Sequence, residues 1–185
     1  MSTPPLEDIA ASIAKRLPRA GSTRLVLIDG PAGSGKSTFA KRLASVLRAP
    51  VVSMDDLIPG WNGLSEGVPR LMEWIVMPLI RRERPRYRRY DWETAEYGAW
   101  VDVGTPAVLI VEGVSCASRE PAKYASFVVW IDAPKDVRLA RGVARDGDRA
   151  RGRWEHWMEQ ERALFKAEDT QRQADIRVAG IEPTR

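Results

Sequence analysis

Eight residues near the start of the chain have the types and the spacing of a phosphate-binding loop. They run from Gly30 to Ser37 as GPAGSGKS and fit the pattern G-x-x-x-x-G-K-[ST] without a mismatch. Glycine permits positive φ, which brings successive backbone N–H groups close to a polyanion. An apolar run at 24–29 precedes the loop and a helical pattern at 37–47 follows it, so nucleotide binding is favoured over a plain glycine turn.

The polar side chains of this loop suit a nucleoside triphosphate with its metal ion. Lys36 can bridge the β- and γ-phosphates, and the Ser37 hydroxyl can ligate Mg²⁺. We therefore predict ATP and Mg²⁺ as cofactors. The ATP-binding residues expected in the loop are Gly30, Ala32, Gly33, Ser34, Gly35, Lys36, Ser37 and Thr38.

Acidic residues end two other apolar runs. Asp55 and Asp56 follow PVVSM, and Glu112 closes AVLIVEG. Ligands of open parallel sheets bind outside the carboxyl ends of the strands. Asp55 could there accept a hydroxyl proton or hold a metal-bound water, and Glu112 could organise Mg²⁺ together with Ser37. A turn, a helix cap or a plain strand-ending acid remains the alternative for each.

Arginines recur in the segment 138–153. Arg138, Arg141 and Arg145 have helical spacing, so one helical face could present them together. The glycines that follow predict an arginine-rich lid at about 146–153. Such arginines would neutralise charge during phosphoryl transfer, and we predict Lys36 and Asp55 as their catalytic partners. A solvated helix face is the alternative for the cluster.

The pattern along the chain predicts one α/β domain with a core at about 22–180. Apolar runs that alternate with helical patterns are typical of a three-layer α/β/α fold with a mostly parallel central sheet, here the P-loop NTPase fold. The expected strands are 24–29, 50–54, 107–113, 127–134 and 174–180, and the expected small β-hairpin pairs 86–92 with 97–103. The expected helices are 6–17, 37–47, 68–81 with a kink or an end at Pro78, 135–145 and 154–171, and 57–69 is expected as a loop.

Composition excludes several classes of protein. The 185 residues are 44% apolar and 29% charged, which is typical of a globular chain, and no apolar run has the roughly 20 residues that cross a membrane. We expect no secretory signal, because the N-terminus lacks a long apolar stretch. One cysteine, Cys116, allows no internal disulfide and fits a cytoplasmic location. A homo-oligomer is compatible with the sequence.

Several segments together resemble the uridine kinase and phosphoribulokinase branch of P-loop kinases. They are GPAGSGKST, VVSMDD, RYDW, LIVEGV, VWIDAPKDVRLARGVARD and ADIRV, in that order. The resemblance covers about residues 22–180 and is weakest between 57 and 85. The order RYDW, VEG and RLARGVARD is more specific to this branch than the phosphate loop is.

The resemblance implies roles for individual residues. Asp55 corresponds to the catalytic base, Glu112 to the metal-organising glutamate, and Tyr90 to the tyrosine that lines the nucleoside pocket. Arg141 and Arg145 correspond to phosphate-contacting arginines of the lid helix, with Arg145 on ATP. The stretch from Gly180 to Pro183 would lie near the adenine.

Two departures from the family concern the acceptor. Ala95 stands where the family has a histidine, and WNGLSEG contains no counterpart of its aspartate. The six arginines of RRERPRYRR at 81–89, Arg88 among them, could instead grip a phosphate on the acceptor, which would favour a sugar phosphate or nucleotide. Trp61 and Trp92 could stack on the acceptor, although packing is the more ordinary role of tryptophan.

The sequence therefore predicts an ATP-dependent kinase that phosphorylates a hydroxyl of a nucleoside-like or sugar-phosphate-like small molecule. Two alternatives stay open. The basic clusters also suit a polynucleotide-end kinase or a nucleic-acid-stimulated NTPase, although we expect no nucleic-acid partner because no aromatic and basic recognition module is evident. The chain could also be a nucleotide sensor without catalysis.

Overall fold

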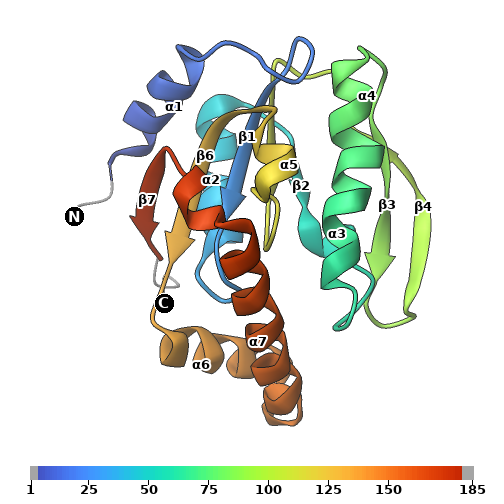
Figure 1. Cartoon of the computed structure of the whole chain (residues 1–185), viewed down its shortest axis with the longest axis vertical. Coiled ribbons are helices and arrows are strands. Elements are labelled where there is room, and N and C mark those ends of the chain that lie inside the picture. The colour runs from blue at the N-terminus through green and yellow to red at the C-terminus, as the bar shows by residue number, and fades with distance from the viewer. Residues whose placement is uncertain (1–3, 181–185) are drawn as a thin grey trace.

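A twisted parallel sheet forms the centre of the computed structural model, which describes residues 4–180 (Figure 1). Its strand order is β2-β5-β1-β6-β7, and every neighbouring pair is parallel. The strands are β1 Arg24–Asp29, β2 Val51–Ser53, β5 Val108–Glu112, β6 Ala125–Asp132 and β7 Ile176–Ala179. The predicted α/β fold and all five predicted strands are confirmed.

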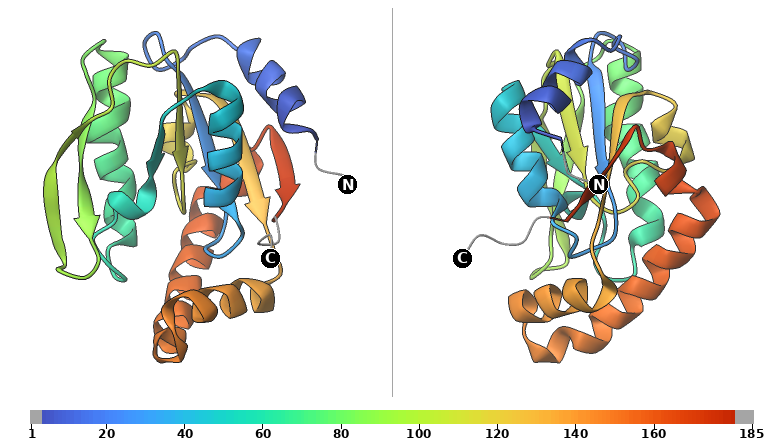
Figure 2. Two further views of the ribbon diagram at one scale, coloured as in Figure 1. Left: turned by 180° about the vertical axis from the view of Figure 1, so that it is seen from behind. Right: turned by 90° about the vertical axis from the view of Figure 1, so that its left-hand side faces the viewer.

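Helices cover both faces of the sheet, because side chains alternate along the buried strands. Leu25 and Leu27 of β1 belong to one apolar cluster, whereas Val26 and Ile28 belong to the other. Figure 2 shows α1 and α2 against one face and α3, α5 and α7 against the other. The helices are α1 Leu6–Ala14, α2 Lys36–Leu47, α3 Leu64–Leu71, α4 Met77–Ile80, α5 Arg119–Ala122, α6 Lys135–Asp146 and α7 Arg151–Glu168.

The helix expected at 68–81 begins earlier than its sequence pattern indicates. It starts at Leu64 and continues through a π-helical turn at Met72–Val76 into α4, so the loop expected at 57–69 ends at Gly63. The glycines and the proline of this segment are typical of a loop. Gly67 is nevertheless buried in the helix and packs so closely that a Cβ atom there would lie 2.7 Å from Ile58. Pro78 was expected to kink or end the helix; a π-helical turn at Met72–Val76 lies just before it, and the helix continues past it to Ile80.

The predicted hairpin is confirmed and forms a separate antiparallel ribbon. Strand β3, Arg86–Asp91, pairs with β4, Glu96–Asp102, with an irregularity in the register between Arg88 and Tyr90. The ribbon lies beside α3 and α4, beyond the β2 edge of the central sheet (Figure 1). It therefore provides a wall outside the carboxyl end of β2.

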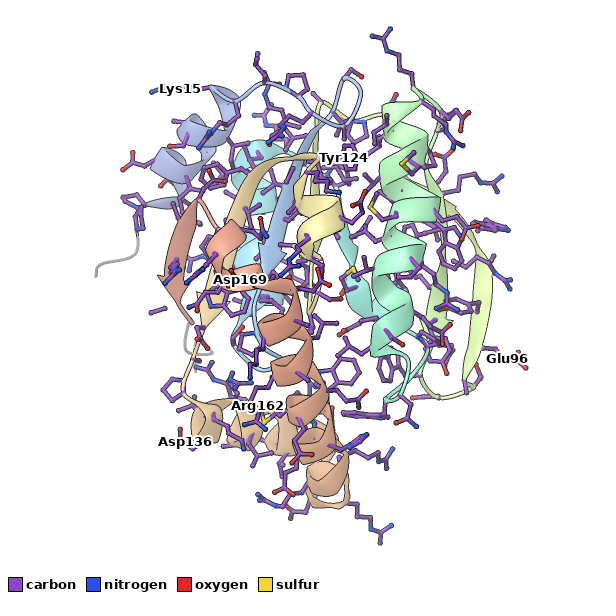
Figure 3. The ribbon with its side chains drawn as sticks, in the orientation of Figure 1. Lys15, Glu96, Tyr124, Asp136, Arg162 and Asp169 are labelled. Carbon is purple, nitrogen blue, oxygen red and sulfur yellow. The ribbon has the colours of Figure 1, made fainter. Side chains whose placement is uncertain are left out.

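The segment expected as a lid at 146–153 is a tight connection between α6 and α7. Gly147 turns the chain with φ 85°, a short 3₁₀ turn follows at Asp148–Ala150, and α7 begins at Arg151. The two helices form a hairpin beneath the carboxyl ends of the strands (Figure 1). Figure 3 shows side chains filling much of the space between α7 and α3 that the ribbon leaves open.

Within residues 4–180, no helix is both long and apolar enough to cross a membrane.

Candidate active site

A cavity of about 780 Å³ lies at the carboxyl edge of the sheet. The phosphate loop, the ends of β2 and β5, the loop after β2, the hairpin, α6 and α7 all contribute to its wall. The residues that line it are Ala32, Gly33, Gly35, Lys36, Ser37, Thr38, Asp55, Asp56, Trp61, Trp92, Glu112, Gly113, Val114, Arg141, Gly142, Ala144, Arg145, Asp146, Trp154 and Trp157. The structure thus brings most of the predicted site residues to one place.

The phosphate loop has the backbone conformation that its glycines predict. Gly30, Gly33 and Gly35 have φ of 142°, 78° and 97°. At Gly30 a Cβ atom would lie 1.9 Å from the carbonyl oxygen of Ile131, so the loop can pass β6 only without a side chain there. Helix α2 begins at Lys36, which directs its N-terminal end toward the loop.

Lys36 is buried beneath the loop that precedes it. Its Nζ donates to the carbonyl oxygen of Pro31 at 2.9 Å, and only 7% of the residue is exposed. This contact ties the ammonium group to the backbone of the loop, and Lys36 is among the residues that line the cavity. A single positive charge is therefore fixed where phosphate would lie against the backbone.

Three oxygen-bearing side chains meet at the end of β5. Ser37 Oγ lies 3.2 Å from both carboxylate oxygens of Glu112, and Ser53 Oγ donates to Glu112 Oε1 at 2.9 Å. Burial raises the pKa of Glu112, Lys36 opposes that shift and the nearby Asp55 adds to it. The arrangement is a serine hydroxyl beside a buried carboxylate, in contact with the helix that begins at Lys36.

This pair fits a Mg²⁺ ion, because that ion prefers oxygen ligands and keeps several of its waters. Among residues 4–180 there is no cluster of three or more histidine, cysteine, aspartate or glutamate side chains that could hold a metal without other ligands. Ser37 and Glu112 would accordingly hold a cation that phosphate and water also coordinate.

The two adjacent aspartates after β2 have different surroundings. Asp56 is half-buried; it lies 3.4 Å from Arg89 Nε and accepts a hydrogen bond of 3.3 Å from the Tyr87 hydroxyl. Burial raises its pKa, and Arg89 partly offsets this effect. Asp55 is exposed at the cavity wall, and the indole N–H of Trp92 donates to its backbone oxygen at 3.0 Å. Side chains of the hairpin therefore bind the Asp56 carboxylate, whereas Asp55 lines the cavity and receives its hairpin contact on the backbone.

The arginines of α6 divide between the cavity and the protein interior. Arg141 lines the cavity and donates to the Gly33 oxygen at 3.2 Å. Arg145 also lines it and pairs with Asp146 at 2.8 and 3.0 Å, a contact that is the main reason for its raised pKa. Arg138 does not line it, so only two of the three arginines expected on one face are at the cavity.

Arg138 and Glu161 form a buried pair that sequence reasoning did not assign to the site. Arg138 Nη1 lies 2.8 Å from Glu161 Oε1 and 3.2 Å from the Ala32 oxygen, while Glu161 Oε2 accepts the Ala32 N–H at 2.8 Å. Glu161 is 2% exposed, and burial raises its pKa. The pair joins α6 and α7 to the phosphate loop. The available signal was an acidic residue on the apolar face of the pattern at 154–171.

Asp29 is a second buried acid that the sequence reading missed. It ends β1 and accepts N–H groups from Gly30 at 2.7 Å, Ser115 at 3.0 Å and Ala117 at 2.8 Å. Burial raises the pKa of Asp29 to about 7, against the lowering effect of these donors. The carboxyl group fixes the start of the phosphate loop to the segment after β5. Its signal was an acid at the end of an apolar strand, directly before the first glycine.

The residue expected to grip an acceptor phosphate lies elsewhere. Arg88 Nε and Nη2 donate to the backbone oxygens of Gly98 and Tyr97 at 2.7 and 2.6 Å. Arg88 does not line the cavity, so its placement in the substrate site is corrected. The physical reason is that the backbone oxygens of β4 bind its guanidinium group and hold it along the hairpin.

Tyr90 and Gly180 also lie outside the cavity wall. The Tyr90 ring packs behind Trp92, with ring centroids 5.8 Å apart, and its hydroxyl faces Gly60. Gly180 lies against the phosphate loop, because a Cβ there would be 2.2 Å from the Ser34 oxygen. The remainder of the stretch expected near the adenine, 181–183, lies outside the described residues.

Four tryptophans meet on one side of the cavity. The Trp61 ring packs edge to face against Trp92 at 5.8 Å and against Trp154 and Trp157 at 6.0 Å each. All four line the cavity, and Gln160 of α7 holds the loop by donating to the Trp61 oxygen at 3.1 Å. We call Trp61, Trp92, Trp154 and Trp157 the tryptophan wall.

Comparisons with known proteins agree with this arrangement, although no protein-family model matches the chain. The chain is 32% identical over 128 residues to a shikimate kinase of Corynebacterium efficiens. The matched stretch covers 69% of this chain and 67% of that enzyme. It is 32% identical over 123 residues to a cytidylate kinase of Haloarcula marismortui, covering 66% of this chain and 58% of the relative. The structure of a possible uridine kinase from Bacillus stearothermophilus shares the fold, with a TM-score of 0.69 at 21% identity over 93% of this chain and 96% of that one.

The match to another shikimate kinase, from Corynebacterium diphtheriae, is 30% identical over 124 residues and spans 65% of this chain and 61% of that relative. The chain therefore covers less than two thirds of some of these enzymes. The sequence similarity, the fold and the phosphate loop nevertheless agree with one another and confirm the predicted family. The chain belongs to the P-loop kinases.

Proposed function

We infer that the protein is an ATP-dependent kinase that moves the γ-phosphoryl group to a hydroxyl of a small molecule. The observation that carries this proposal is one cavity shared by Lys36, Ser37, Asp55, Glu112 and two arginines of α6. A phosphoryl transferase needs these groups together, since its catalysis rests on position and charge rather than on covalent chemistry.

Each group of the chain would have a defined task. The loop amides and Lys36 hold the phosphates, and Ser37 and Glu112 hold Mg²⁺, which neutralises phosphate charge when bound. Asp55 orients the acceptor hydroxyl and accepts its proton. The hydroxyl oxygen forms its bond to the γ-phosphorus while the bond to the leaving ADP oxygen breaks. Arg141 and Arg145 stabilise the charge on the transferring group.

The separate surroundings of the two aspartates support this assignment. Asp56 is occupied by Arg89 and Tyr87, whereas the carboxylate of Asp55 has no hydrogen bond or ion pair to another side chain within residues 4–180. An ion pair lowers the basicity of a carboxylate, so the carboxylate without a partner is the better candidate for the proton acceptor. A sensor that only binds nucleotide would not need an unengaged carboxylate in the cavity that Lys36 lines.

A coupled assay for ADP release tests the proposal over nucleosides, nucleotides, sugars, sugar phosphates and hydroxy acids. We expect Asp55→Asn to lower kcat by at least about a hundredfold with ATP affinity retained, since it removes the proton acceptor. Lys36→Ala should lose both turnover and ATP affinity. Arg24→Gln, at the opposite end of β1, serves as a control outside the cavity. Normal turnover by Asp55→Asn would remove this residue from the mechanism, and ATP binding without transfer to any acceptor would favour the sensor.

A further inference from the structure

Arg145 reaches the cavity from an exposed position near the end of α6. Its side chain is 66% exposed, so packing alone does not fix the direction of the guanidinium group. A long side chain loses conformational freedom when it is held in one orientation to bind a ligand. Groups that hold Arg145 in advance would therefore favour its contact with a phosphate.

Two side chains hold this arginine. Asp146 accepts a hydrogen bond from Arg145 Nε at 2.8 Å and another from Nη2 at 3.0 Å, so the pair is bidentate. The guanidinium group also lies over the Trp154 ring, 5.4 Å from its centroid. The indole N–H of Trp154 in turn donates to Asp146 Oδ2 at 2.9 Å. Each of the three side chains thus contacts the other two, and we call Asp146 and Trp154 the arginine clamp.

The hairpin of α6 and α7 fixes the position of Trp154. Gly147 has φ of 85° and reverses the chain between the two helices, which brings Trp154 of α7 back onto α6. The ring lies directly on the backbone of Gly142, where a Cβ atom would be 2.3 Å from it. Because Trp154 is only 3% exposed, its N–H offers Asp146 a hydrogen-bond donor of fixed position.

The charges around Arg145 agree with this orientation. The hydrogen bonds from Arg145 lower the pKa of Asp146, and the charge of Arg153 contributes to the same effect while its guanidinium lies over the Trp61 ring. The pKa of Arg145 is raised, chiefly by Asp146, and the charge of Asp55 on the cavity wall adds to this effect. Arg145 therefore lies between its clamp and the carboxylate of the proposed proton acceptor.

One donor atom of Arg145 remains available for a ligand. Nε and Nη2 are bound by Asp146, whereas Nη1 has no hydrogen bond to another residue within the range 4–180. Arginine presents its donors in a rigid planar fork, so fixing two of them also fixes the direction of the third.

Resting on the function inferred above, we propose that Asp146 and Trp154 are positioning residues that direct Arg145 toward the γ-phosphate of ATP. Arg145 would contact the phosphate through Nη1, and both residues of the clamp would act through Arg145. Asp146 supplies the charge that holds the guanidinium, and Trp154 fixes Asp146 with its N–H and supports the guanidinium with its ring.

Calorimetric titration in the presence of Mg²⁺ tests this proposal without an acceptor, with ADP and the β,γ-imido analogue of ATP as probes. The unmodified protein should bind the analogue more tightly than ADP, because only the analogue has a γ-phosphate. Asp146→Asn should weaken binding of the analogue by about tenfold and binding of ADP by less than about twofold, since Arg145 loses the charge that holds it. Trp154→Phe keeps a ring but removes the N–H donor, and should weaken binding of the analogue by about threefold.

A double-mutant cycle distinguishes positioning from a general effect on the fold. In a protein that already carries Arg145→Ala, the change Asp146→Asn should weaken binding of the analogue no further, because both changes remove the same contact. Asp148→Asn is the matched control, since Asp148 is a nearby exposed acid that does not line the cavity. The Tm of Asp146→Asn should shift by less than about 4 °C, as expected for an exposed ion pair.

Three results would overturn the proposal while leaving the kinase function to the ADP-release assay. They are unchanged binding of the analogue by Asp146→Asn, additive losses in the double-mutant cycle, and equal affinity of the unmodified protein for ADP and the analogue. Failure of the unmodified protein to bind either nucleotide would overturn the kinase function as well.

Discussion

The buried pair of Arg138 and Glu161 makes a specific prediction about stability. Replacing Glu161 with alanine leaves the Arg138 charge without its carboxylate and the Ala32 N–H without its acceptor. Removing one partner of a buried ion pair typically costs about 3–5 kcal/mol. The upper part of that range should apply, because Glu161 is 2% exposed and its two oxygens satisfy two different groups.

The expected consequence is a lower melting temperature together with weaker ATP binding. For a chain of this size, a loss of 3–5 kcal/mol corresponds to a drop in Tm of about 6–20 °C. ATP affinity should fall as well, since the Ala32 segment of the phosphate loop is no longer held by α7. Denaturant titration gives the free energy of unfolding, and calorimetric titration with ATP gives the affinity.

Matched variants separate this pair from general effects on α7. Glu159→Ala, an exposed acid on the same helix, should shift the free energy of unfolding by less than about 0.5 kcal/mol. Arg138→Ala combined with Glu161→Ala should show a coupling of at least about 1 kcal/mol, since the two side chains are in direct contact. The reasoning is wrong if Glu161→Ala costs less than about 1 kcal/mol or if the double-mutant cycle is additive.

Three further predictions concern the edges of the site. Burial raises the pKa of Asp29 to about 7 in the folded protein, whereas the unfolded residue ionises near pH 4. The contribution of Asp29 to the free energy of unfolding should therefore fall by on the order of 4 kcal/mol as the pH rises from 4 to 7, and stay constant above pH 7. Denaturation measured against pH should lose this slope in Asp29→Asn. Gly30→Ala should abolish ATP binding or destabilise the fold by more than about 2 kcal/mol, because its Cβ would collide with the Ile131 oxygen, and calorimetry with ATP checks this. Glu112→Gln should raise the Mg²⁺ concentration needed for half-maximal turnover by about tenfold, and an unchanged Mg²⁺ dependence would exclude Glu112 as the metal-organising group.

The sequence predicts those parts of the site that short-range rules control. The phosphate loop needs glycines at fixed offsets, and β1 and β5 are apolar runs that end in an acid, so their placement follows from local pattern and parallel topology. The start of α3 was missed for a complementary reason. Glycine is typical of loops, but Gly67 lies in a helix where the lack of a side chain allows close packing against Ile58 and Met54.

Long-range pairing determines the remaining parts, and composition alone cannot reveal it. Arg138, Arg141 and Arg145 look equivalent along their helix, but Glu161 withdraws only the first into the interior. Arg88 and Arg89 are adjacent in the hairpin, yet backbone oxygens hold one and Asp56 holds the other. The groups that bind each guanidinium, rather than the residue type, determine whether these arginines lie in the interior, on the hairpin or at the cavity.

The hairpin contacts the acidic pair and the tryptophan wall at once. Arg89 and Tyr87 engage Asp56, and Trp92 of the same segment binds the backbone of Asp55 while its ring joins Trp61. Moving the hairpin would therefore alter both the proton acceptor and the acceptor surface. One packing arrangement thus positions both the proposed base and the Trp61 ring, and a change in hairpin register should shift kcat and acceptor KM together rather than either alone.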